Sequence, residues 1–365
     1  MRFRSSPHVD LMQLGDLAPE RREHFLELER DPDFYGLFAA RAPLAMNLKA
    51  VNRSTAELFR ELATPAPLDA DEDMIDLVLD GILEVESGDG FVCGADALPL
   101  LAPIADAAPA SRLAHDALLH AQDLETSDPQ SLTTALYLYN RIPITPFWRA
   151  RFADAEAVLA YVGADRAPLR PLLEQRWTAS RGLAGWLGWF SPSRAPRGEH
   201  DVTYKLYVSP RPERIAETFA IVTRVLADFP EASFKLGNGV IGLLRPDKLV
   251  AYFASREEML AAAESLRREL AGCDAHGVPF TAALDEGGLL SWGVDPPGSE
   301  VALRWLGRTS WRLWLVNRLG SALAIAKCAR TASAVEPWRF AIERARRHGV
   351  DVDTWTPSAT LWSNG

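Results

Sequence analysis

In the second half of the chain, the pattern of apolar and polar residues alternates between strand and helix. Residues 201–210 alternate with a period of two, which places Lys205 and Tyr207 on one face of a strand and Leu206 on the other. The expected helices are 211–230, 255–272 and 310–329, and the expected strands are 233–237, 248–253, 279–284 and 287–295. This order predicts an α/β domain in which helices pack against a mixed sheet.

The first half is predicted to be mainly helical. Apolar residues recur at helical spacing in three segments, 18–31, 52–64 and 108–163. Residues 71–98 differ, because an apolar helix is followed by two short strands joined by a Ser-Gly-Asp-Gly turn. This resembles a winged-helix-like unit, which either docks a partner or serves as scaffold.

A segment rich in Ser, Pro, Arg and Gly, residues 181–201, predicts a domain boundary near residue 199. The expected fold class is therefore α+β. A mainly helical domain, 1–198, would carry the wing, and a mixed-sheet α/β domain would span 199–365.

Composition narrows the class of function. The chain has 365 residues and a net charge of −10, and the negative charge lies in residues 1–200. That balance argues against general nucleic-acid binding. Three cysteines are far apart and no histidines have ligand spacing, which predicts a reducing compartment and no metal or cofactor. No apolar run approaches 18 residues, so no membrane span is expected, and the basic N-terminus lacks the apolar region of a secretory signal.

Six side chains in the second half are candidates for chemistry. They are Lys205, Tyr207, Lys235, Arg245, Tyr252 and Arg312. Each has a structural explanation when taken alone, such as a solvated lysine or a turn arginine paired with Asp247. Together they place cations beside large apolar side chains, which is costly unless the cations meet an anion. Since a planar guanidinium suits the two-bond binding of phosphate, the group predicts a phosphate-directed site.

Four short motifs resemble those of a known class of enzyme. They are Lys-x-Tyr at 205–207, Phe-Lys-Leu at 234–236, the strand from Arg245 to Tyr252, and Trp-Arg at 311–312. This series resembles bacterial phosphothreonine lyases, which include type III secretion effectors and the lyase domains of some lanthipeptide synthetases. It is more similar to the HopA-type effector family, whose members also accompany kinase-like proteins in class V lanthipeptide pathways. The resemblance covers roughly residues 200–330.

The resemblance implies a phospho-Ser/Thr lyase that removes phosphate by β-elimination, without metal or cofactor. In that interpretation Lys235 is the base, Arg245 and Arg312 clamp the phosphate with help from Lys205, and Tyr252 orients it. Effector lyases carry a histidine as general acid at the position of Tyr207. Tyrosine in place of this histidine implies a slower lyase or a protein that binds phosphate without eliminating it, because loss of a general acid lowers the rate by about 10²–10⁴-fold.

Three hypotheses about function therefore stand. The first is a lyase that yields dehydroalanine or dehydrobutyrine in a peptide-modifying pathway, or that acts as an effector on a host phosphoprotein. The second is a module that binds a phosphopeptide or a kinase-like partner. The third is an interaction protein without a phosphate site, whose cations would point to different surfaces. The expected partner is a phosphorylated peptide or protein, and the expected location is the bacterial cytoplasm, with translocation as an effector left open.

Overall fold

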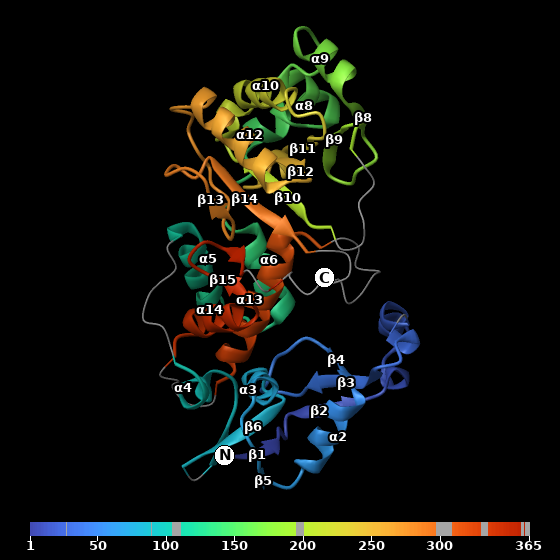
Figure 1. Ribbon diagram of the computed structural model, residues 1–365, viewed down its shortest axis with the longest axis vertical. Helices are drawn as coiled ribbons and strands as arrows, with labels where there is room; N and C mark the ends of the chain where they lie inside the picture. The colour runs from blue at the N-terminus through green and yellow to red at the C-terminus, as the bar shows by residue number, and fades with distance from the viewer. Residues whose placement is uncertain are drawn as a thin grey trace.

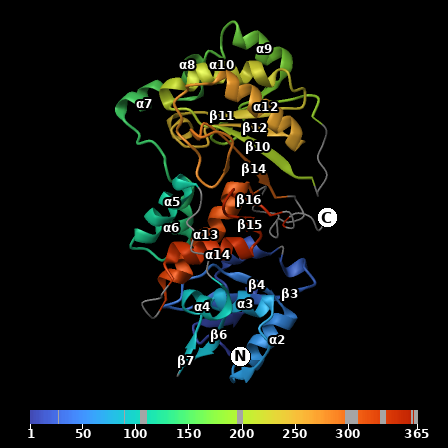
Figure 2. The same cartoon turned by 60° about the vertical axis from the view of Figure 1, so that its left-hand side comes forward.

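The protein forms three tiers along its long axis, as the computed structural model shows (Figure 1). The structure describes residues 1–26, 28–88, 90–103, 111–194, 201–296, 309–329, 335–358 and 361. The N-terminal tier lies at one end, a helical tier lies in the middle, and a seven-stranded sheet with its covering helices lies at the other end (Figures 1 and 2). The fold class is α+β, as the sequence predicts.

The N-terminal tier is built from two antiparallel sheets with orders β5-β1-β6-β7 and β2-β3-β4. Its strands are β1 (Arg2–Ser5), β2 (Val9–Met12), β3 (Phe34–Ala40), β4 (Lys49–Asn52), β5 (Ala66–Pro67), β6 (Leu83–Ser87) and β7 (Gly90–Val92). Its α-helices are α1 (Pro19–Arg22), α2 (Arg53–Glu61), α3 (Glu72–Leu79) and α4 (Leu98–Leu101), and its 3₁₀ helices are η1 (Leu14–Asp16), η2 (Glu23–Phe25), η3 (Leu28–Arg30) and η4 (Gly94–Asp96). This tier therefore contains more strand than the mainly helical prediction.

The winged-helix-like unit expected at residues 71–98 is present, but it is part of a larger sheet. The helix and hairpin are present as α3, β6 and β7, but β6 also pairs with β1. The hairpin is thus half of a four-stranded sheet and does not project alone, because Leu83 and Val85 bury against Phe3 of β1 in one apolar core. The helix expected at 18–31 is broken into α1, η2 and η3.

The middle tier joins segments that lie far apart in sequence. Its helices are α5 (Arg112–Asp123), α6 (Pro129–Leu138), α13 (Trp311–Lys327) and α14 (Pro337–Arg347), and a short hairpin of β15 (Val350–Asp351) and β16 (Thr356–Pro357) lies beside them. One apolar core holds the four helices together and includes Leu118, Leu132, Leu319 and Ile342. The last two helices of the expected C-terminal domain therefore pack on helices from the first half.

The third tier is a sheet of order β13-β14-β10-β12-β11-β9-β8. Its strands are β8 (Thr178–Ser180), β9 (Trp186–Phe190), β10 (Thr203–Val208), β11 (Ser233–Gly237), β12 (Leu249–Phe253), β13 (Ala282–Ala283) and β14 (Leu290–Asp295). The helical elements of this part of the chain are α7 (Pro146–Arg151), α8 (Ala155–Val162), α9 (Leu169–Arg176), η5 (Pro212–Arg214), α10 (Ile215–Leu226), α11 (Val240–Leu243) and α12 (Arg256–Glu269). Every pairing among these described strands is antiparallel, where the sequence predicted a mixed sheet.

This sheet crosses the boundary expected near residue 199. Strand β9 hydrogen-bonds to β11, and Trp189 of β9 stacks on Phe234 of β11 with ring centroids 5.0 Å apart. Helices α8, α9, α10 and α12 lie over one face of the sheet (Figure 1). Their shared apolar core runs continuously from Trp148 to Leu290, so residues before and after 199 fold as one unit.

Candidate functional site

The six side chains singled out from the sequence lie on one face of the sheet or beside it. In β10, Lys205 and Tyr207 point away from the helix-covered core, while Leu206 between them is fully buried in it. The antiparallel register places Lys205 directly opposite Tyr252 of β12. Lys235 lies two residues from the β11 partner of Tyr252 and so shares the same face. The cations therefore gather on the face that helices α8, α10 and α12 leave uncovered.

Lys235 lies between two aromatic rings. Its Nζ is 3.9 Å from the centroid of the Trp186 ring and 5.6 Å from that of Tyr252. Across the described ranges this ammonium forms neither a hydrogen bond nor an ion pair. Burial, followed by repulsion from Lys205, lowers the pKa of Lys235 to about 8. Part of the Lys235 population is therefore the neutral amine near pH 7, and only the neutral amine can accept a proton.

Arg245 and Arg312 share one carboxylate, that of Asp247. Arg245 donates from Nε to Oδ1 at 2.5 Å and from Nη2 to Oδ2 at 2.9 Å. Nη1 of Arg312 lies 3.0 Å from the same Oδ2. Burial acts to raise the pKa of Asp247, but Arg312 and then Arg245 outweigh it and hold the pKa at about 2. Asp247 is therefore ionised at every physiological pH.

The two arginines differ in exposure. The Arg312 side chain is 1% exposed, its Nε donates to the carbonyl of Pro279 at 3.1 Å, and its Nη2 donates to the carbonyl of Tyr137 at 3.1 Å. Its Nη1 lies within ion-pair distance of Asp247 but forms no hydrogen bond with it. The Arg245 side chain is 20% exposed and also donates to the Tyr137 hydroxyl at 2.8 Å. Arg245 can therefore meet a ligand, whereas Arg312 is placed to hold Asp247 and the chain around Tyr137.

A second ion pair lies across the same face. Nζ of Lys205 is 2.6 Å from Oδ2 of Asp295, and both side chains are largely buried. The other oxygen of Asp295 accepts a hydrogen bond at 2.9 Å from the backbone N–H of Trp311, which begins helix α13. Gly293 allows this close packing, because a Cβ at that position would lie 2.9 Å from the Trp311 ring. The start of α13 is thereby fixed against β14 beside the cations.

The two tyrosines keep their protons. Tyr207 is 3% exposed, and burial followed by the charge of Asp295 raises its pKa well above the usual value. Burial and then Asp295 also raise the pKa of Tyr252. The Tyr252 ring lies 5.3 Å from the Lys205 ammonium as well as close to that of Lys235. Both phenols are available as hydrogen-bond donors at neutral pH, and both are weak acids.

The face carries more positive than negative charge. Its cations are Lys205, Lys235, Arg245 and Arg312, and its carboxylates are Asp247 and Asp295. Among the described residues, the two carboxylates balance two of the four cations. This leaves an excess of two positive charges when Lys235 is protonated and of one when it is neutral. Excess positive charge in a largely buried cluster favours an anionic ligand such as a phosphate.

Three neighbours of the site were not predicted from the sequence. Trp186 contacts Lys235 and also lies 5.0 Å from the Arg245 guanidinium, while Tyr137 lies 4.8 Å from that of Arg312. Arg194 lies 6.0 Å from the Tyr252 ring. All three precede residue 199, so the boundary expected from the sequence places them in the first domain. The alternation in Trp-Leu-Gly-Trp-Phe, residues 186–190, was the available signal for a strand of this sheet.

A buried lysine–histidine pair lies at the end of the same strand face. Lys248 is fully buried, and its Nζ lies 2.7 Å from Nδ1 of His276 and donates to the carbonyl of Pro210 at 3.0 Å. The other ring nitrogen of His276, Nε2, donates its N–H to the carbonyl oxygen of Asn140. Burial lowers the pKa of Lys248 to about 7, and burial with the charge of Lys248 lowers the pKa of His276 to about 3.

Among the residues that the structure describes, no group of three or more His, Cys, Asp or Glu side chains is arranged to hold a metal ion. Cys93, Cys273 and Cys328 are not joined by disulfides. Within the described ranges, no helix has the length and apolar character needed to cross a membrane.

No known protein family matches the sequence, and no curated protein matches it significantly. Among solved structures, the chain is similar to an effector protein from Pseudomonas syringae pv. tomato strain DC3000. The identity is 11% over 67% of this chain and 96% of that chain, with a TM-score of 0.38. An effector protein from Pseudomonas syringae pv. syringae strain 61 gives 12% identity over 68% of this chain and all of that chain, with a TM-score of 0.37. Similarity at this level does not establish a shared fold, so the function is argued from the site itself.

Proposed function

We propose that the protein is a phospho-Ser/Thr lyase that removes phosphate from a peptide by β-elimination. One observation carries the proposal. Lys235 has no anionic partner among the described residues, its pKa is lowered to about 8, and the face keeps one excess positive charge when this amine is neutral. The reaction needs a neutral base beside a bound phosphate, and a lysine of lowered pKa on a positively charged face supports both requirements.

The proposed step needs no water and no external reagent. The neutral amine of Lys235 takes the Cα proton of the phosphorylated residue and becomes an ammonium. The electron pair of the Cα–H bond forms the Cα=Cβ bond, and the Cβ–O bond breaks with its electrons going to the phosphate oxygen. The products are a dehydroamino acid in the peptide and free inorganic phosphate.

The phosphate would be held first by Arg245, the more exposed of the two arginines. Lys205 lies beside Tyr252, largely buried in its ion pair with Asp295, and would assist through its positive charge. Arg312 would act as a positioning residue, since it holds Asp247, which in turn orients the Arg245 guanidinium through two hydrogen bonds. Tyr207 would donate a hydrogen bond to the leaving phosphate. A phosphate already neutralised by cations leaves with less need of a strong acid.

The substrate class follows from this chemistry. The phosphoamino acid must be made by a kinase-type phosphoryl transfer, and the alkene product is an electrophile that a thiol can attack. A peptide-modifying pathway would use that alkene, whereas an effector would act by destroying a phosphorylated signal.

The test is the mass of a synthetic phosphothreonine peptide after incubation with the protein. Loss of one phosphoric acid, followed by addition of a thiol to the product, identifies an alkene and separates elimination from hydrolysis. Lys235→Ala is expected to abolish the loss, while Arg267→Ala, which removes an exposed cation on α12, should not change it. Elimination that continues at the wild-type rate in Lys235→Ala would overturn the assignment of the base.

A second function is favoured by one feature, the buried Tyr207 at the position where effector lyases carry a histidine. Because its pKa is raised well above the usual value, Tyr207 is a poor proton donor to a leaving group. A phosphopeptide-binding module would keep the cations and have no need of an acid. That alternative predicts saturable binding of the phosphopeptide with no change in its mass, and binding that Arg245→Gln weakens.

A further inference from the structure

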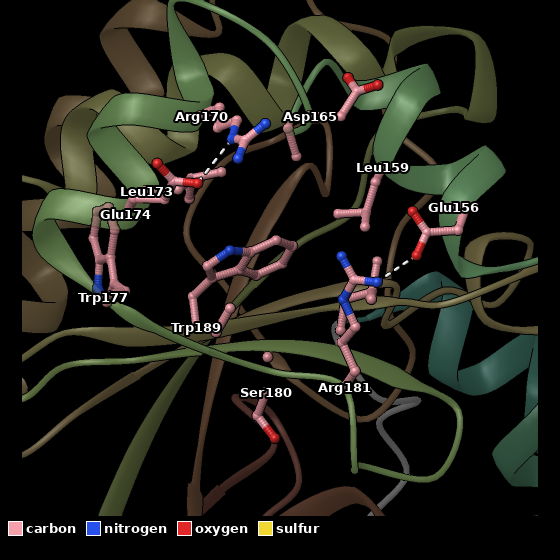
Figure 3. Close-up of a pocket in the computed structure, with 14 residues that line it drawn as sticks. Glu156, Leu159, Asp165, Arg170, Leu173, Glu174, Trp177, Ser180, Arg181 and Trp189 are labelled. Atoms are coloured by element: carbon pink, nitrogen blue, oxygen red, sulfur yellow. Dashed lines mark hydrogen bonds and ion pairs between the residues drawn. The ribbon is translucent and has the colours of Figure 1, made fainter.

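A pocket of about 450 Å³ lies at the opposite face of the same sheet, where β8 and β9 meet helices α8 and α9 (Figure 3). The side chains of Leu159, Leu173, Trp177 and Trp189 line it. In Figure 3 the Trp189 indole lies between two ion pairs. The volume falls within the range of pockets that hold small ligands, about 300–1,000 Å³.

The charges at the rim are already paired. Arg170 lies 2.8 Å from Glu174, and Arg181 contacts Glu156 (Figure 3). The remaining carboxylate, Asp165, pairs with the adjacent Arg166 at 3.2 Å. The pocket thus offers its occupant two indoles and three leucines, Leu187 being the third, but no unpaired charge, so the part that enters must be apolar.

The strand beside the pocket is an open edge of the sheet. Strand β8 is last in the strand order and pairs with β9 alone in the part of the chain that the structure describes. Thr178 and Ala179 are exposed, and no hydrogen bond occupies the outward backbone groups of the strand within the described ranges. Lysine and proline, which protect many exposed edges, are absent from Thr-Ala-Ser, so its short length of three residues is the feature that limits pairing here. Such an edge accepts an extended backbone.

We propose that β8 and this pocket together bind an extended segment of the substrate peptide. The segment would add to β8 as a further antiparallel or parallel strand of about three residues, the length of β8 itself. Since alternate side chains of a strand share a face, one bulky apolar side chain of that segment would enter the pocket and lie against Trp177 and Trp189. The identity of the peptide as substrate rests on the proposed function, but the docking can be measured without turnover.

The position of the edge predicts a spacing within the peptide. An added strand would be three strand steps from β11, in the order added strand, β8, β9, β11. At about 4.8 Å per step this is roughly 14 Å from the strand that carries Lys235. An extended chain covers at most about 3.5 Å per residue. At least about four residues must therefore separate the apolar anchor from the phosphorylated residue.

Docking is tested with fluorescein-labelled peptides that carry unphosphorylated threonine in a glycine–serine background. One peptide has tryptophan six residues before the threonine, a second has it six residues after, and each has a partner with serine in place of tryptophan. We expect fluorescence anisotropy to show at least tenfold tighter binding of one tryptophan peptide than of its serine partner. Equal binding of tryptophan and serine peptides in both orders would overturn the proposal.

A matched pair of variants locates the site. Ala179 lines the pocket and is exposed, so Ala179→Phe fills the pocket without disturbing the core. Ala160 is exposed on α8 outside the pocket, and Ala160→Phe makes the same chemical change there. The tryptophan preference should vanish in Ala179→Phe and persist in Ala160→Phe, with circular dichroism confirming that both fold. A preference that survives in Ala179→Phe would refute docking at this pocket.

The spacing rule and the catalytic proposal are then separated by turnover. With phosphothreonine peptides, tryptophan six residues away on the productive side should raise kcat/KM, whereas tryptophan two residues away should not. An equal effect at both spacings would contradict the assigned edge. Peptide docking without any loss of phosphoric acid would refute the proposed lyase function but not the docking site. Elimination without a preference for the tryptophan peptide would refute the docking site but not the lyase function.

Discussion

The Lys235 ammonium lies 3.9 Å from the centre of the Trp186 ring, and these two residues come from strands on opposite sides of residue 199. Strand β9 brings the indole next to β11 by direct backbone pairing, with Lys235 opposite Gly188. A ring face stabilises an ammonium, yet burial and Lys205 together still lower the pKa of Lys235 to about 8. The pair thus combines a fixed position for the amine with a readily lost proton, as a general base requires.

The rate of elimination should depend on pH through Lys235. Because only the neutral amine can take the Cα proton, kcat/KM is expected to rise with pH through about 8 and then level off. Lys235→Arg keeps the positive charge, but a guanidinium stays protonated, so the rate should fall by at least about 10²-fold at every pH. Initial rates of alkene formation from pH 6 to 10 check this. A flat wild-type profile would rule out Lys235 as the titrating base.

The Asp247 carboxylate should be essential to stability. Asp247→Asn removes the charge that pairs with Arg245 and with the buried Arg312. Breaking one partner of a buried ion pair costs about 3–5 kcal/mol in the free energy of unfolding. Urea denaturation measures the loss. The matched control is Glu174→Gln, whose solvent-exposed pair with Arg170 should contribute little to the free energy of unfolding.

The two arginines should separate phosphate binding from positioning. Arg245 is partly exposed, so Arg245→Gln is expected to weaken binding of a phosphothreonine peptide by about 10- to 100-fold through loss of charge-assisted hydrogen bonds. Arg312 is buried with two backbone carbonyls as acceptors, so Arg312→Gln should chiefly lower the free energy of unfolding. Isothermal titration and urea denaturation of both variants distinguish the roles. A stable Arg312→Gln protein that has lost phosphopeptide binding would instead make Arg312 a direct ligand.

His276 should make the protein sensitive to acid. Its pKa is about 3 in the folded protein, compared with 6.5 when unperturbed, so the unfolded chain binds more protons between these values. Stability from this group is therefore complete above about pH 6.5 and is lost as the pH falls toward 3, by on the order of 4 kcal/mol. Urea denaturation between pH 4 and 7 should show a shallower slope for His276→Gln than for the wild type. The matched control is His120→Gln, which makes the same chemical change at an exposed position.

Local sequence determined most of the secondary structure in the second half. Strand β11 spans the expected 233–237, and α12 and α13 begin after the serine caps Ser255 and Ser310. The alternation in β10 correctly placed Lys205 and Tyr207 on one face. These features follow from side-chain period and from caps, which involve only neighbouring residues. Helix α2 is likewise capped locally, because the Asn52 side chain accepts a hydrogen bond from the backbone N–H of Thr55.

Tertiary structure alone decided the partners of each element. The composition near residue 199 suggested a boundary, yet β9 pairs with β11 across it, and α13 packs on α6 of the first half as well as on α14 of its own half. The carboxylate that two arginines share and the indole beside Lys235 are likewise set by contacts between distant segments. The residue types and their faces were thus determined by the sequence, since periodicity is local. The pairing of strands and the pKa of Lys235 were decided only by the folded structure, because sheet order and burial depend on long-range packing that no local pattern records.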